Sequence, residues 1–73
     1  MKPDPQADIR AAFKRRRERL GLSGHAMAKL LGMAQSRYHG IENSATVRLT
    51  PEIRAQLDKA LSELEAEMRR QTG

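Results

Sequence analysis

The sequence predicts an all-α fold, because four helical segments can be placed along its 73 residues and no strand can. Apolar residues recur every three or four positions in these segments, which is the pattern of helices that bury one face. Glycine or proline stands where most of the segments begin or end, as expected at helix boundaries. We expect a chain of this length to form one domain, residues 1–73, with a small hydrophobic core.

The first helix is expected to begin at Asp4 and Pro5, with the aspartate as its cap and the proline at its first position. Gly21 ends this helix. Its inward face carries four apolar residues at helical spacing: Ile9, Ala12, Phe13 and Leu20. Its opposite face carries four basic residues, which we expect to face solvent: Lys14, Arg15, Arg16 and Arg19.

Ser23 is the expected cap of a second helix, which Gly32 ends. Three apolar residues share one face of this helix: Met27, Leu30 and Leu31. A third helix begins near Gln35, and its Tyr38 and Ile41 face inward because they are three residues apart. The remaining positions of the third helix are expected to point outward: Gln35, Ser36, Arg37, His39 and Gly40.

Residues 43–49 lack a helical period and predict a loop, after which Thr50 and Pro51 begin a last helix of about residues 51–71. At about 1.5 Å per residue this helix is roughly 31 Å long, which is more than a small core can cover. We therefore expect Leu64 and Met68 to lie beyond the core and to be covered by a second copy of the chain. The alternative is a frayed, charged end. The complete apolar stripe is Ile53, Leu57, Leu61, Leu64 and Met68.

The charge of the chain is unevenly distributed. Its formal net charge is +5, but residues 1–48 hold ten basic and four acidic side chains, whereas residues 49–73 hold four basic and five acidic ones. A basic half suits a polyanion, because each neutralised phosphate releases counterions. An anionic membrane would also attract it, and a simply solvated helix face is the remaining interpretation.

Catalysis, metal binding and membrane insertion have little support in the sequence. The chain has no cysteine, and His25 and His39 lack the companions and spacing of a metal site. Glu63 and Glu67 share a helix face, but such an exposed carboxylate pair is ordinarily solvated. No apolar run could cross a bilayer, and residues 1–6 lack the features of a signal peptide. We expect a cytoplasmic protein that is not an enzyme and holds no metal or cofactor.

Four short segments together resemble the lambda-repressor and Cro family of helix-turn-helix regulators: residues 21–23, 27–28, 31–33 and 41–43. The similarity extends from about Ile9 to Leu61. In this family a small residue such as Ala28 lets two helices approach closely, and Gly32 supplies the sharp turn between them. The resemblance implies a helix-turn-helix domain of four to five helices with a long C-terminal helix, and with its motif at about residues 23–42.

The resemblance also implies that the third helix enters the major groove of double-stranded DNA. Gln35 occupies the family's first base-reading position, where a glutamine can bind adenine N6 and N7. Ser36 and His39 are the next residues in reach. Arg37 could read guanine or bind a phosphate. Gly40 stands where relatives often have a reading side chain, so this helix either loses one contact or approaches the bases more closely.

Further resemblances concern the DNA backbone. Relatives often begin the second helix with a glutamine that grips a phosphate, but this chain has Gly24 there. The backbone amides of that turn could hold the phosphate instead, assisted by Ser23 or His25. Asn43 and Arg48 are the other expected phosphate ligands. Ser44 replaces the glycine that relatives usually have at this position, which leaves the conformation of the loop open.

Arg17 and Glu42 match a pair that in relatives links the first helix to the end of the third, so we expect a structural bridge that orients the recognition helix. Tyr38 and Phe13, the only aromatic residues, are expected in the core.

The resulting hypothesis is a bacterial or phage transcriptional repressor, associated with the nucleoid when bound, that occupies a palindromic operator as a homodimer. Two rivals use the same fold: a module that binds another regulator or polymerase, and an antitoxin-like autoregulator.

Overall fold

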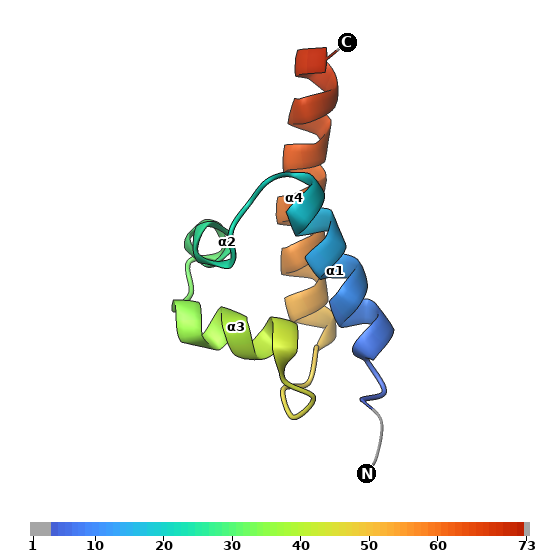
Figure 1. Ribbon diagram of the computed structural model, residues 1–73, viewed down its shortest axis with the longest axis vertical. Coiled ribbons are helices and arrows are strands. Elements are labelled where there is room, and N and C mark those ends of the chain that lie inside the picture. Colours follow the sequence, from blue (N-terminus) through green and yellow to red (C-terminus); the bar gives the residue numbers. More distant parts are fainter. Residues whose placement is uncertain (1–3, 73) are drawn as a thin grey trace.

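The computed structural model describes residues 4–72 and forms four helices over that range (Figure 1). Residues 1–3 and 73 lie outside the described part, as does the side chain of Thr72, so the expectations for a domain of residues 1–73 and for a signal peptide fall partly outside it. No strand occurs within residues 4–72, and the predicted all-α class is confirmed. The helices are α1 (Ala7–Arg19), α2 (Gly24–Leu31), α3 (Gln35–Asn43) and α4 (Pro51–Thr72).

The helices share one hydrophobic core. Helices α1 and α4 lie beside each other, while α2 and α3 lie to one side of them (Figure 1). Helix α3 packs against both α1 and α2, and α4 packs against α1 and α2. Tyr38 and Ile41 are buried, as predicted. The buried apolar residues are Met27, Ala28, Tyr38, Ile41, Leu49, Leu57 and Leu61.

Two predicted core positions are wrong. Leu30 leaves 55% of its surface exposed, and Ala12 is exposed as well. Helix α2 has only eight residues and directs Met27 and Ala28 inward, so Leu30 falls on the outer side of its last turn. Periodicity defines the width of an apolar stripe but not how much of it neighbouring helices cover.

Helix α1 begins later than predicted. Asp4 and Pro5 precede it, and the helix starts at Ala7. The carboxylate of Asp4 instead accepts hydrogen bonds from the N–H of Gln6 (3.0 Å) and from Nε of Arg10 (2.8 Å). The N–H of Gln6 and then the guanidinium of Arg10 lower the pKa of Asp4. A local ion pair with Arg10, six residues farther on, thus takes the place of the predicted cap.

The predicted boundaries around α2 are confirmed. Oγ of Ser23 accepts a hydrogen bond from the N–H of Ala26 (3.0 Å), which caps the helix. Gly32 ends it with a φ of 67°, a left-handed conformation that glycine adopts at little cost. The next N–H, that of Met33, returns to the carbonyl of Ala28 (3.0 Å) and closes the turn toward α3.

Helix α4 reaches beyond the rest of the molecule, and its last turns extend past the other helices (Figure 1). The side chain of Thr50 accepts a hydrogen bond from the N–H of Ile53 and so caps the helix at its predicted start. Leu57 and Leu61 are both buried in the core, whereas Leu64 is half-buried and Met68 is 44% exposed. The exposure of the stripe therefore rises from Leu61 toward the C-terminal end of the helix.

Arg16 does not lie on a free solvent face as predicted. Its guanidinium binds Asp58 (2.9 Å) and Glu65 (2.7 Å) on α4, and it lies 5.9 Å from the ring centre of Phe13. This arginine lowers the pKa of Glu65. The basic face of α1 is thus partly neutralised by α4, because the carboxylates of α4 come within reach only when the two helices pack together.

Candidate nucleic-acid interface

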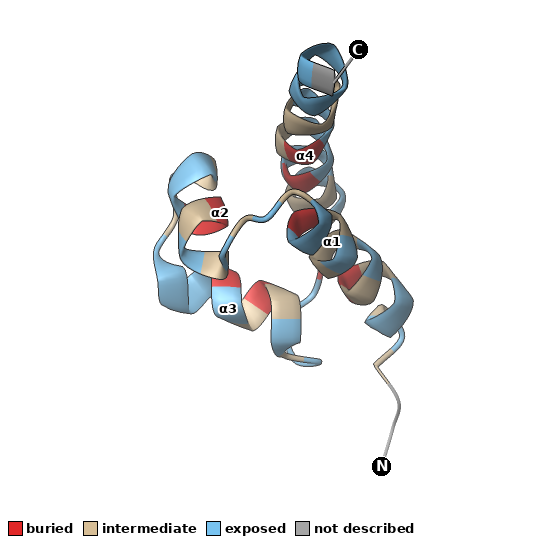
Figure 2. Cartoon of the chain, turned by 45° about the horizontal axis from the view of Figure 1, so that its top comes forward, coloured by how far each residue is buried: buried red, intermediate tan, exposed pale blue. Residues whose placement is uncertain are grey.

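Helix α3 has a buried side and an exposed side. Tyr38 and Ile41 are 3% and 2% exposed, respectively. Four residues on the other side are exposed: Gln35, Ser36, Arg37 and His39. Figure 2 shows the pale blue, exposed positions of α3 interrupted by its two buried ones. The residues predicted to read bases therefore share the solvent side of one short helix.

A shallow hollow joins this side of α3 to the start of α2. It is lined by Gly24 from α2 and by five residues of α3: Gln35, Tyr38, His39, Glu42 and Asn43. The structure thus brings together residues that the sequence places in two separate helices. We call the exposed residues of α3 and the first turn of α2 the α2–α3 surface; its members are Ser23, Gly24, His25, Gln35, Ser36, Arg37, His39 and Asn43.

Two side-chain contacts organise the α2–α3 surface. Nδ1 of His25 lies 3.2 Å from Oε1 of Gln35, which links the first turns of α2 and α3. Nδ2 of Asn43 donates to the carbonyl of His39 (3.1 Å) and lies 3.4 Å from Nδ1 of the same residue. Asn43 therefore turns back along α3, so contact with a phosphate would require its side chain to rotate or to use Oδ1.

The first turn of α2 offers backbone donors. Ser23 satisfies the N–H of Ala26, while the N–H groups of Gly24 and His25 have no acceptor within the helix. Such a turn attracts anions, because free N–H groups and the helix dipole both favour negative charge. A Cβ on Gly24 would lie 3.8 Å from the ring of Tyr38, an ordinary contact. The absence of a side chain at position 24 is therefore not a steric requirement.

Gly40 does not point outward as predicted. It is half-buried, and a Cβ built on it would lie 3.4 Å from Cγ2 of Val47 in the loop after α3. The loop folds back along α3 and covers this position, which the helical period alone could not reveal. A side chain at position 40 would first meet Val47.

The loop accommodates Ser44 without strain. Its φ is −98°, so the position needs no left-handed conformation and hence no glycine. Oγ of Ser44 lies 2.7 Å from Oγ1 of Thr46 and accepts a hydrogen bond from the N–H of Thr46. The serine thus closes its own turn. Arg48, four residues farther on, is exposed.

Arg17 and Glu42 form a two-fold ion pair between α1 and α3. Nε and Nη2 of the arginine bind the two carboxylate oxygens at 2.9 and 2.8 Å, and the side chains are 11% and 8% exposed. Nη1 of Arg17 also donates to the carbonyl of Leu22 (2.6 Å). Burial alone would raise the pKa of Glu42, but the hydrogen bonds from Arg17 and Tyr38 and the positive charge of Arg17 together outweigh it and hold the pKa below its ordinary value.

Tyr38 packs beside this ion pair. Burial raises the pKa of its phenol, and the adjacent Glu42 carboxylate raises it further. Tyr38 is therefore neutral at physiological pH and acts as an anchor of α3 rather than as an exposed stacking surface.

A model of the helix-turn-helix domain family matches residues 8–71. The chain belongs to this helix-turn-helix family. No curated protein and no solved structure gives a significant match to the chain. The helix-turn-helix domain indicates a DNA-binding regulator, and domains of this kind are typically not enzymes. The match contains the whole α2–α3 surface.

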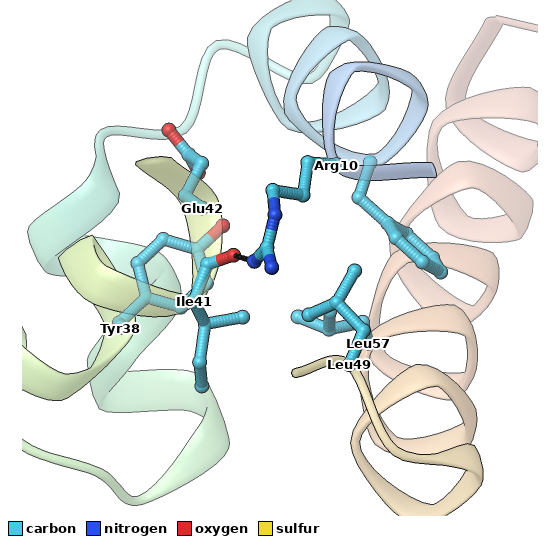
Figure 3. A pocket seen from close by; sticks show the side chains of 7 residues that line it. Arg10, Tyr38, Ile41, Glu42, Leu49 and Leu57 are labelled. Atoms are coloured by element: carbon cyan, nitrogen blue, oxygen red, sulfur yellow. Dashed lines mark hydrogen bonds between the residues drawn. The ribbon is translucent and has the colours of Figure 1, made fainter. Parts of the chain in front are cut away.

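Sequence reasoning missed two residues that hold the helix-turn-helix unit in place, Arg10 and Gln6. Arg10 is buried, and its guanidinium donates to the carbonyl of Ile41 (Figure 3). The same guanidinium donates to the carbonyl of Val47, and its Nε binds Asp4. It thereby joins α1 to the end of α3 and to the following loop. One signal was available, since Arg10 stands seven residues before Arg17 and so lies on the same side of α1.

Gln6 binds the other end of the loop that follows α3, at Leu49. Its side-chain amide donates to the carbonyl of Leu49 (3.0 Å) and accepts from the N–H of the same residue (2.7 Å). The partner lies 43 residues away in the sequence, so no local pattern could have indicated it. Arg10 and Gln6 together position the loop that carries Arg48.

Within residues 4–72, no group of three or more His, Cys, Asp or Glu side chains has a geometry that could hold a metal ion. None of the helices in that range has the length and apolar character needed to span a bilayer.

Proposed function

We propose that the protein is a sequence-specific regulator of transcription that inserts α3 into the major groove of double-stranded DNA and represses by occupying its operator. The observation that carries this proposal is the α2–α3 surface, in which the exposed side of α3 lies next to the free backbone donors at the start of α2. A recognition helix needs this arrangement, because α2 can hold the DNA backbone while α3 meets the base edges.

Base reading is assigned to four residues of α3: Gln35, Ser36, Arg37 and His39. Gln35 is the first residue of the helix and can bind both N6 and N7 of adenine. Ser36 and His39 follow on the same exposed side. Arg37 can bind guanine or a nearby phosphate, and either contact contributes to affinity.

Phosphate contacts are assigned to the first turn of α2 and to the two ends of the loop. Ser23, Gly24 and His25 surround the free N–H groups of α2, which suit a phosphate oxygen. Asn43 and Arg48 extend the contact toward the loop after α3. Arg37 on α3 and Arg48 in the loop after it support this role, because both are exposed and positively charged.

We further propose that the regulator is a homodimer assembled through the last turns of α4. A groove beside these turns is lined by Leu20, Leu22, Leu64, Glu67, Met68 and Gln71. Four of these six side chains are apolar, and the groove lies where Leu20 at the end of α1 and the following Leu22 approach the C-terminal turns of α4. A second copy would cover this apolar surface and place two recognition helices on two half-sites. Adjacent half-sites one helical turn apart would be about 34 Å from each other.

The decisive experiment selects bound fragments from a genomic library and then footprints them. A symmetric site with a salt-dependent affinity is the expected result. Gln35→Ala should then lose about 1–3 kcal/mol of discrimination at one base pair in each half-site and leave nonspecific binding nearly unchanged. Gln56→Ala, which removes an exposed glutamine from α4, is the matched control. An equal loss on every DNA sequence would remove Gln35 from the reading residues.

Sedimentation equilibrium tests the proposed dimer by measuring the molecular mass of the protein in solution. Leu64→Lys should shift the protein toward the monomer, because it places a charge in the proposed apolar contact. Leu30→Lys changes a leucine that is exposed on α2 instead, and it should leave the association unchanged. A monomeric wild-type protein at the concentrations at which it binds its operator would contradict the proposed assembly.

A further inference from the structure

We propose that His25 is a positioning residue for base recognition, which orients the amide of Gln35 so that its adenine-reading edge faces the DNA. This inference rests on the proposed function, because it assumes that Gln35 reads a base. It assigns to His25 a role distinct from that of a phosphate ligand.

Within residues 4–72, the hydrogen bond between these two residues is the only side-chain hydrogen bond that joins the α2 and α3 members of the α2–α3 surface. Nδ1 of His25 lies 3.2 Å from Oε1 of Gln35, although the residues are ten positions apart. Both residues are exposed, so neither is held in place by burial in the core. Gly24 lines the same hollow but has no side chain that could hold Gln35. The adjacent His25 provides that contact.

The chemistry of an amide explains why such a contact matters. A glutamine reads adenine by accepting from the N6 amino group through its oxygen and donating to N7 through its nitrogen. Its terminal torsion is broad and roughly two-fold, so a free amide can exchange the places of oxygen and nitrogen. The reversed amide would set its nitrogen against the N6 amino group, where two donors would meet.

An imidazole that carries its proton on Nδ1 removes this ambiguity. It donates to Oε1 of Gln35. It cannot bind a reversed amide in this way, because the amide nitrogen is only a donor and cannot accept a hydrogen bond. The oxygen of Gln35 has two acceptor sites, so one remains for adenine after His25 has used the other. The side chain is then held before DNA arrives, and less conformational freedom is lost on binding.

The test measures operator affinity in a double-mutant cycle of His25→Ala and Gln35→Ala. Each variant is titrated with the operator and with a version in which the base pair read by Gln35 is replaced. His25→Ala should reduce discrimination at that base pair about two- to tenfold, the range expected from releasing one ordered side chain. In the Gln35→Ala background it should have no further effect on discrimination.

Lys29→Ala is the matched control, because it removes an exposed side chain of α2 that lies outside the α2–α3 surface. It should leave discrimination at the Gln35 base pair unchanged. A uniform loss of affinity for all DNA sequences in His25→Ala would overturn the positioning role, because it would show a phosphate contact instead. A loss of discrimination that persists at full size in the Gln35→Ala background would also overturn it.

A measurement without DNA tests the contact directly. The ¹⁵N shifts of the neutral His25 imidazole should show its proton on Nδ1 in the wild-type protein and a shift of the tautomer equilibrium toward Nε2 in Gln35→Ala. An unchanged tautomer would overturn the proposed contact. Wild-type protein that binds DNA without any sequence preference would overturn the proposed function, whereas sequence-specific binding with no effect of His25→Ala on discrimination would overturn only the role of His25.

Discussion

The inner side of α3 is buried and bound to other helices, whereas its outer side is exposed and carries polar groups. On the inner side, Tyr38 and Ile41 fill the core, and Glu42 is paired with Arg17 of α1. On the outer side, Gln35 has a single side-chain contact with His25, and Ser36 and Arg37 are exposed. The same nine-residue helix thus contains one side whose position is strongly determined and one side that can be varied.

The inner residues therefore hold α3 in place, whereas the outer residues have the proposed role of choosing the bases. A substitution on the inner side should alter the fold and therefore DNA binding of every sequence. A substitution on the outer side should leave the fold intact and alter recognition alone. Because of this division, the residues that read bases can change while the core and the position of α3 stay the same.

The largest effect on stability is expected from removing the buried ion pair between Arg17 and Glu42. Arg17→Ala should lower the free energy of unfolding by about 3–5 kcal/mol, because it leaves the carboxylate of Glu42 largely buried without its partner. Urea denaturation followed by circular dichroism measures the change. Arg15→Ala removes an exposed arginine from the same helix and should change stability by no more than about 0.5 kcal/mol. Equal effects of the two variants would contradict a bridge at Arg17.

Acid should weaken the ion pair on the inner side of α3. Because the pKa of Glu42 is lowered in the folded protein, this residue stabilises the fold above its ordinary pKa, and that stability is lost as the pH falls through the folded value. Asp4 and Glu65 shift in the same direction. Unfolding midpoints measured between pH 7 and pH 3 should therefore fall in the acidic range. Glu42→Gln should flatten this dependence, and an unflattened curve would assign the acid sensitivity to the other carboxylates.

The outer surface should accept a new phosphate contact without any change in the fold. Gly24→Gln places a glutamine where relatives of this type often use one to bind the DNA backbone, and its Cβ has room beside Tyr38. We expect operator affinity to increase by about 1.5 kcal/mol, roughly tenfold, as for a hydrogen bond to a charged group. Fluorescence anisotropy with labelled operator measures it. Gly24→Ala adds only the Cβ, and an equal gain in that variant would show that the effect comes from helix stability.

The smallest effect is expected at Arg48, which lies outside α3. Arg48→Ala should reduce the slope of log affinity against log salt concentration by about one unit, because one phosphate contact is lost. Binding titrations at several salt concentrations give the slope. Lys59→Ala removes an exposed positive charge from α4 and should leave the slope unchanged. If both variants reduced the slope equally, the effect would reflect net charge rather than contact.

The features that sequence patterns predicted correctly are those with local causes. Ser23 caps α2 because its side chain reaches an N–H three residues away, and Gly32 ends α2 because of its own backbone conformation. Tyr38 and Ile41 are buried because the helical period places them on one side. The predictions for Leu30, Gly40 and Arg16 were wrong because neighbouring elements decide which side of a helix is covered.

Local sequence patterns specify the four helices, the first residues of α2, α3 and α4, and the residues of α3 that face inward. These properties follow from capping, glycine conformation and periodicity, which act within a few residues. How α3 is held in place, and which groups support its exposed side, depend instead on the packing of the helices against one another. The bonds of Arg10 to the end of α3, of Gln6 to Leu49 and of His25 to Gln35 join residues ten to 43 positions apart. Such partners meet only after the helices have packed, because their separation in the chain carries no information about their distance in space.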